Sequence, residues 1–229
     1  MIASSKTAAV CALIAICIAF PLHAEASPQA SALKHKLEQQ LGAYGRIQKI
    51  EIDSDLGTPA LLSGVLSKPS RHTPEWIAYD FLREVRTHYG LIHPLREMLV
   101  KEKTSSTDGG SIVKLQQLLF NTPVYGGQLE IQVDRDGVVR RVEGTVYPGL
   151  EEKLFHRRTY PVVSSKKAVR LAKASYRGEG ELSSKPVVTR YYLPDRPGTP
   201  LVYEVIFEIE GAPSPYRVLI HAVMGHIIP

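Results

Sequence analysis

The sequence has little of the residue on which disulfide and thiolate chemistry depends. Only two cysteines occur among 229 residues, and both, Cys11 and Cys17, lie within the first 26. If that segment is removed on export, no thiol remains, which excludes disulfides and cysteine-based metal sites. Long apolar runs are also lacking. The run from Ala8 to Phe20 is shorter than the roughly 20 residues of a membrane-spanning helix, and nothing later is long and apolar enough.

The motifs of common enzyme classes are missing as well. The sequence contains no H-E-x-x-H, G-x-S-x-G, Walker or dinucleotide-binding pattern. Seven histidines follow residue 26, and none pairs with another on one helix face as metal ligands would: His35, His72, His88, His93, His156, His221 and His226. We therefore expect no catalytic residues, no metal site, no cofactor and no enzymatic activity.

Glu204 and Glu208 are the candidate carboxylate pair for a glycosidase site. Glu204 and Glu208 lie on one face of a predicted strand, and their separation is roughly 13 Å from the rise of a strand. That exceeds the roughly 5–9.5 Å between the carboxylates of a glycosidase. We therefore expect both glutamates to lie on a solvent-exposed face of the strand.

The N-terminal segment is typical of an export signal. Lys6 precedes the apolar run, Pro21 ends it, and the small residues of Ala24-Glu25-Ala26 fit a cleavage site. We predict a signal peptide at residues 1–26, cleaved after Ala26 or Ala24; an uncleaved membrane anchor is the alternative. The protein is then secreted or periplasmic, with no stable membrane span. The net charge of +5 suits nucleic acid, an anionic surface or an acidic protein partner, and export argues against nucleic acid.

Two helices are predicted in the first half. Leucines at every fourth position indicate a helix within residues 29–45, and a partly ordered lead-in is the alternative. A better-marked helix begins after Thr73, which can cap it, with Pro74 at its first position, and ends before Gly90. Its apolar face is expected to pack on a sheet.

From residue 111 the apolar pattern alternates with a period of two. Strands are expected at residues 112–120, 128–134 and 138–146, with Asp134 to Gly137 forming a hairpin turn. A second unit repeats the order: a helix capped by Ser164 or Ser165, then strands at 187–193, 201–209 and 216–223. The expected fold class is α+β, two units that each pack a helix on an antiparallel β-sheet.

One ordered run of residues resembles a known family, the fungalysin/thermolysin propeptide domain. A glutamine pair, a Pro-Val-x-Gly segment, an Asp-x-x-Gly turn and a strand ending in glycine carry the likeness: Gln116, Gln117, Pro123, Val124, Gly126, Gly127, Asp134, Gly137 and Gly144. Residues 160–229 resemble the PepSY-type half that follows in such propeptides. The resemblance implies a cystatin-like or PepSY-like architecture, with a propeptide domain at 27–147 and a PepSY-like domain at 148–229. Gly126, Gly127 and Gly144 are expected mainly to shape the backbone, and one glutamine of the pair is expected to reach solvent or a partner.

The resemblance also implies a function. Propeptides of thermolysin-like zinc metallopeptidases template the folding of the catalytic domain and block its active site. Here we expect a propeptide-like chain without the catalytic domain, since residues 1–229 contain no zinc-binding half. The leading hypothesis is an exported inhibitor or folding assistant that binds such a peptidase in trans; the alternative is a PepSY-type binding module of the cell envelope without a protease partner. The sequence leaves open which peptidase is bound, whether the protein acts in the periplasm or the medium, and whether it is a decayed precursor.

The resemblance places the end of the chain nearest the peptidase cleft. The predicted contact residues are Gly225, His226, Ile227, Ile228 and Pro229. The isoleucines would fill apolar subsites, and a carboxylate at Pro229 would approach the zinc ion. The alternative is that these residues only complete the last strand.

Overall fold

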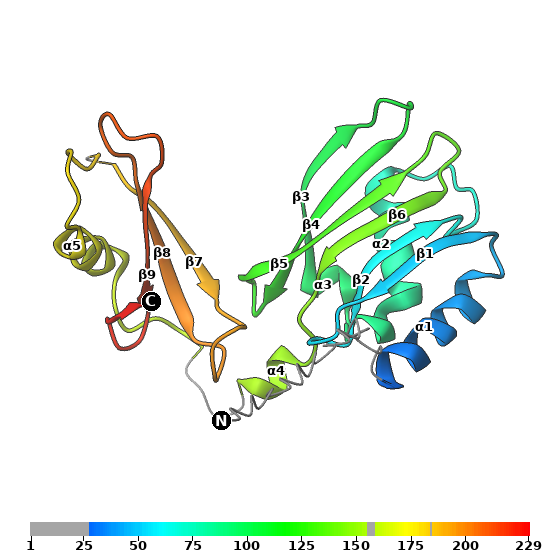
Figure 1. Cartoon of the computed structure of the whole chain (residues 1–229), viewed down its shortest axis with the longest axis horizontal. Helices are drawn as coiled ribbons and strands as arrows, with labels where there is room; N and C mark the ends of the chain where they lie inside the picture. The colour runs from blue at the N-terminus through cyan, green and yellow to red at the C-terminus, as the bar shows by residue number, and fades with distance from the viewer. Residues whose placement is uncertain (1–27, 155–158, 184) are drawn as a thin grey trace, which may run out of the picture.

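The computed structural model describes residues 28–154, 159–183 and 185–229, so the predicted signal peptide lies outside it. Helices and strands build two antiparallel sheets that are joined at one point, which confirms the α+β prediction (Figure 1). In the described part of the chain, every helix is too short or too polar to cross a membrane.

The first sheet has six strands in the order β1-β2-β6-β5-β4-β3, and every neighbouring pair is antiparallel. The strands are β1 (Ile47–Ile52), β2 (Pro59–Gly64), β3 (Met98–Ser105), β4 (Ser111–Leu119), β5 (Thr122–Val133) and β6 (Val139–Thr145). The predicted hairpin joins β5 to β6. Asp134 accepts hydrogen bonds from the N–H groups of Asp136 and Val138, each at 2.9 Å, and Gly137 has a φ of 74°. This is the turn chemistry that the sequence indicates.

Two helices cover one face of this sheet. The leucine spacing of α1 (Pro28–Leu41) brings Leu37 and Leu41 into the core. At the start of α2 (Pro74–Val85), the Thr73 hydroxyl accepts a hydrogen bond from the Trp76 N–H, as a capping residue does. The apolar face of α2 packs on β4, β5 and β6. A 3₁₀ turn, η1 (Arg86–His88), extends it, and Gly90, whose φ is 65°, follows two residues later.

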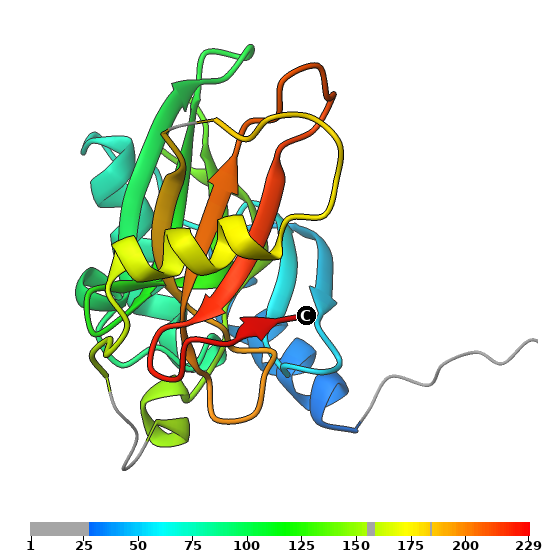
Figure 2. The same cartoon turned by 90° about the vertical axis from the view of Figure 1, so that its left-hand side faces the viewer.

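The second sheet has the order β7-β8-β9-β10, again antiparallel, with β7 (Val187–Tyr192), β8 (Leu201–Phe207), β9 (Tyr216–His221) and β10 (Ile227–Ile228). The helix α5 (Ser165–Ser175) lies across β8 and β9 (Figure 2). Ser164 caps this helix by accepting a hydrogen bond from the Lys167 N–H. Ala168 and Ala172 allow its close approach to the sheet because they are fully buried with small side chains.

The β4–β5 hairpin connects the two sheets. Its turn, Phe120–Asn121, has positive φ at both residues. Leu119 and Val124 beside this turn belong to the hydrophobic core of the second unit, and Val124 pairs in parallel with Tyr192 of β7. The first half of β5 thus joins the second sheet, while its second half lies at the centre of the first. The division of the chain into a propeptide domain at 27–147 and a PepSY-like domain at 148–229 remains a proposal.

Candidate protein-binding site

The glutamine pair is held inside the fold. Gln116 and Gln117 on β4 are each only 4% exposed, so the expectation that one of them reaches solvent is wrong. The Nε2 group of Gln116 donates to the carbonyls of Val124 and Gly127, at 2.7 and 2.8 Å, and its Oε1 accepts from Gln128. These bonds span the irregular part of β5 around Gly126, where the regular β4–β5 pairing is interrupted. Gln116 thereby ties together two carbonyls of β5 on either side of Gly126, across the interruption of the ladder.

Gln117 holds the segment that leads into the second unit. Its Nε2 donates to the Tyr147 carbonyl at 2.8 Å, and its Oε1 accepts from the Tyr147 N–H at 2.9 Å. The Gln117 amide and the backbone N–H and C=O of Tyr147 thus form a two-bond clamp. Burial, with Asp195 nearby, raises the pKa of the Tyr147 phenol to about 12.

The glycines of the motif allow this close packing. A side chain at Gly127 would meet Gln117 Oε1 at 2.8 Å. Gly144 has a φ of 135°, and a Cβ there would lie 2.1 Å from the Gln128 carbonyl oxygen. Gly126, with a φ of 74°, faces the Tyr147 ring. Asp134 is the one acidic residue of the motif. Burial acts to raise the pKa of its carboxyl group, but hydrogen bonds from the Val138 N–H and the Arg140 guanidinium outweigh burial and hold this pKa below its usual range.

The predicted contact segment forms an edge strand. After β9 the chain turns at Gly225, whose φ is 79°, and Ile227 and Ile228 pair with Ile220 and Leu219 of β9. The Arg196 guanidinium donates to the Pro229 carbonyl. The segment is therefore docked on the sheet, and the outer edge of β10 has no neighbouring strand among the described residues.

Glu204 departs from its predicted place. It lies on the central strand β8 and is 6% exposed, so the expected solvent-facing position is wrong for this residue. Arg217 on β9 places its Nε 3.3 Å from Glu204 Oε1, and that oxygen has no well-formed hydrogen bond. Glu208, after the end of β8, is exposed. The sheet buries Glu204 because strands flank it on both sides.

The histidines do not form a ligand cluster in the described ranges. The rings of His221 and His226 lie 5.0 Å apart, and His221 Nδ1 accepts hydrogen bonds from the N–H groups of Val223 and Met224. Across residues 28–154, 159–183 and 185–229, no three His, Cys, Asp or Glu side chains come together as metal ligands.

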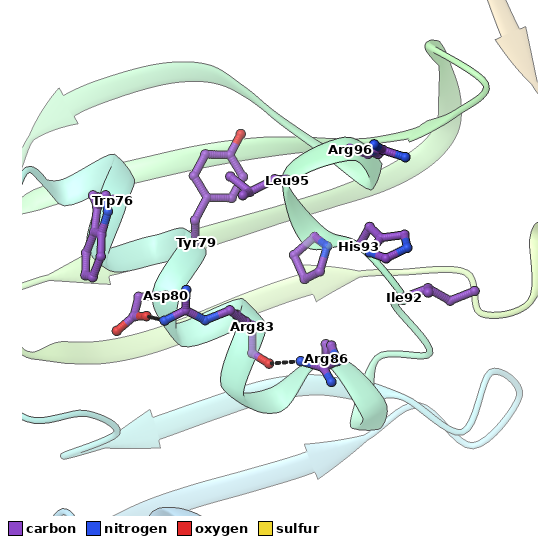
Figure 3. A pocket seen from close by; sticks show the side chains of 10 residues that line it. Trp76, Tyr79, Asp80, Arg83, Arg86, Ile92, His93, Leu95 and Arg96 are labelled. Atoms are coloured by element: carbon purple, nitrogen blue, oxygen red, sulfur yellow. Dashed lines mark hydrogen bonds and ion pairs between the residues drawn. The ribbon is translucent and has the colours of Figure 1, made fainter.

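A groove of about 590 Å³ lies on the outer side of α2, which the sequence did not indicate (Figure 3). It runs between α2 and the turn that carries α3 (Pro94–Glu97). Three apolar side chains around it are exposed in the folded chain: Trp76 at 46%, Ile92 at 64% and Leu95 at 74%. Its other lining residues are Tyr79, Asp80, Arg83, Arg86, His93, Pro94 and Arg96. Exposed apolar groups gathered around a hollow are typical of binding sites.

The walls of this groove are fixed by hydrogen bonds. The Tyr79 hydroxyl donates to the Met98 carbonyl at 2.9 Å, which ties α2 to the start of β3. Glu97 accepts from the N–H groups of Ile92 and His93, which closes the turn before α3. The Trp76 ring lies against His72, with ring centroids 4.1 Å apart. The groove is therefore formed before any partner binds.

Comparisons with known proteins agree with the motif found in the sequence. The family described as "Fungalysin/Thermolysin Propeptide Motif" matches residues 99–146, which run from β3 through β6. Bacillolysin of Bacillus cereus is 24% identical over 177 residues, which cover 75% of this chain and 31% of that protein. The chain therefore spans about a third of this relative's length. The C-terminal domain of YpeB from Bacillus megaterium aligns with 86% of this chain and 94% of its own length, at 13% identity and a TM-score of 0.34.

Proposed function

We propose that this chain is an exported, non-catalytic propeptide-like protein that binds the catalytic domain of a thermolysin-type zinc metallopeptidase, as an inhibitor, a folding assistant or both. The observation that carries the proposal is the family match over residues 99–146. The similarity to Bacillolysin, which extends to 75% of the chain, supports it.

The structure offers a physical basis for such binding. Both sheets are joined by the β4–β5 hairpin, and the amide clamps of Gln116 and Gln117 fix that hairpin. A surface that is already ordered loses little conformational freedom on binding, so more of its contact energy appears as affinity. The positive net charge would speed encounter with an acidic partner, an effect that salt weakens.

We place the contact with the peptidase cleft at β10. An edge strand presents unpaired backbone groups, and an extended polypeptide is what the cleft of a peptidase accepts. Ile227, which is partly exposed, and Ile228 would supply apolar side chains for its subsites. Either β10 binds while docked on β9, or it detaches first, which requires breaking only the short pairing with β9 and the Arg196 contact.

Two matched variants test this placement. Ile227→Asp puts a charge on the outer strand β10, and Val187→Asp puts one on β7, at an exposed position of the same sheet. With a purified thermolysin-type peptidase, we expect Ile227→Asp to raise the inhibition constant at least tenfold and Val187→Asp to change it less than threefold. Deleting residues 226–229 should abolish inhibition while the far-ultraviolet circular dichroism is kept. Full potency in the deleted chain would exclude β10 as the contact.

Assistance of folding needs a separate assay. The acid-unfolded catalytic domain is refolded with and without an equimolar amount of residues 27–229, and the peptidase activity is compared after the two proteins have been separated. A higher yield with the chain present supports the folding role. An unchanged yield together with strong inhibition restricts the function to inhibition.

A further inference from the structure

We propose that the groove between α2 and α3 is a second binding site, which takes a short acidic polypeptide segment with an apolar side chain flanked by carboxylates. The groove lies in the first unit, away from the strands β7 to β10 of the second. The proposal does not rest on the peptidase assignment.

The charges around the groove select for an acidic ligand. Four charged side chains other than histidine line it, three of them arginines. Arg83 is paired with Asp80, so that pair is neutral. Arg86 donates only to the Arg83 carbonyl, at 3.4 Å, and the Arg96 side chain has no hydrogen bond or ion pair within the described ranges. Two guanidinium groups therefore remain for a ligand, and a guanidinium binds a carboxylate through two parallel hydrogen bonds.

The exposed apolar side chains of the groove set a second requirement for the ligand. The exposed side chains of Ile92 and Leu95 line the wall of the groove opposite α2 (Figure 3). Burying a leucine- or phenylalanine-sized group against them removes apolar surface from water on both partners. A ligand with carboxylates alone, such as a free dicarboxylic acid, would leave this wall exposed.

A polypeptide fits the groove better than a membrane surface does. The site is a hollow between two walls, and a lipid surface is flat on this scale. Trp76 is held against the His72 ring and is only half exposed, so it is not free to insert among lipids.

Trp76 is the single tryptophan of the chain, so its fluorescence reports on this site alone. The mature chain is titrated with a capped twelve-residue peptide that has leucine at every third or fourth position among glutamates. Its twin carries lysine in place of each glutamate. Vesicles of phosphatidylglycerol and phosphatidylcholine form the third probe. We expect a saturable change in Trp76 emission with the acidic peptide, and binding at least tenfold weaker with the lysine twin and with 0.5 M salt.

Charge-reversal variants provide the matched control. Arg86→Glu combined with Arg96→Glu should weaken the acidic peptide at least tenfold. Arg170→Glu with Arg177→Glu makes the same charge change on and just after α5, where the Arg177 guanidinium donates to the carbonyls of Ala174 and Tyr176. This control should change affinity less than twofold. If the first double variant is unstable, Leu95→Ser tests the apolar wall, because Leu95 is exposed. Equal binding of both peptides, no change in the groove variants, or a response to vesicles alone would each overturn the proposal.

Discussion

Replacing Gln117 by leucine tests whether the glutamine pair is part of the framework of the molecule. Leucine keeps most of the buried volume but removes both hydrogen bonds to the Tyr147 peptide, at 2.8 and 2.9 Å. Leaving a buried polar group unpaired costs about 1–3 kcal/mol. The N–H and the C=O of Tyr147 both lose their partner. Because Tyr147 is only half-buried, water can hydrogen-bond to them and offset part of this cost. We therefore expect a loss of about 2–3 kcal/mol in the free energy of unfolding.

Urea denaturation followed by circular dichroism measures this loss. With a slope of about 2.5 kcal/mol per molar urea, the midpoint should fall by about 1 M with no change in slope. Gln132→Leu is the control, since Gln132 lies on β5 and its side chain makes no hydrogen bond in the described structure; its effect should stay within about 0.5 kcal/mol. A midpoint for Gln117→Leu equal to that of the control would refute the clamp.

Three further changes follow from the same structure. Gly144→Ala should lower the melting temperature by several degrees, because its Cβ would lie 2.1 Å from the Gln128 carbonyl oxygen and its φ is positive. Asp134→Asn should lower the free energy of unfolding at pH 7. Because the pKa of Asp134 is lower in the folded than in the unfolded chain, its carboxylate stops stabilising the fold as the pH falls through the folded-state pKa. The urea midpoints of the variant and the parent should therefore become equal at low pH. Arg217→Ala should destabilise more than Glu204→Leu in thermal unfolding, because it leaves a buried carboxylate without its cation.

Local signals allowed much of the fold to be predicted. The Thr73-Pro74 start of α2 and the Asp134–Gly137 turn depend on bonds within a few residues, and both were predicted from sequence. The strands β1, β2 and β3 were not. β2 begins with Pro59, which is unusual within a sheet, and β3 is an edge strand whose charged outer residues weaken the apolar pattern.

The sites were harder to predict because they depend on contacts between distant residues. An alternating pattern places Glu204 in solvent, and only the flanking strands and Arg217 show that it is buried. Gln117 reaches Tyr147, thirty residues away, to form its clamp. The groove joins residues of α2 to the loop before α3, and no spacing in the sequence indicates that Trp76 and Leu95 share one hollow.

The central claim is that the folded chain binds a thermolysin-type catalytic domain without chemistry of its own. Isothermal titration of the mature chain into the zinc-loaded catalytic domain tests it most directly. The account predicts one chain per peptidase, with a dissociation constant of about 1 µM or tighter, which corresponds to about −8 kcal/mol. Absence of binding at about a hundred times that concentration, or hydrolysis of peptides by the chain alone, would contradict it.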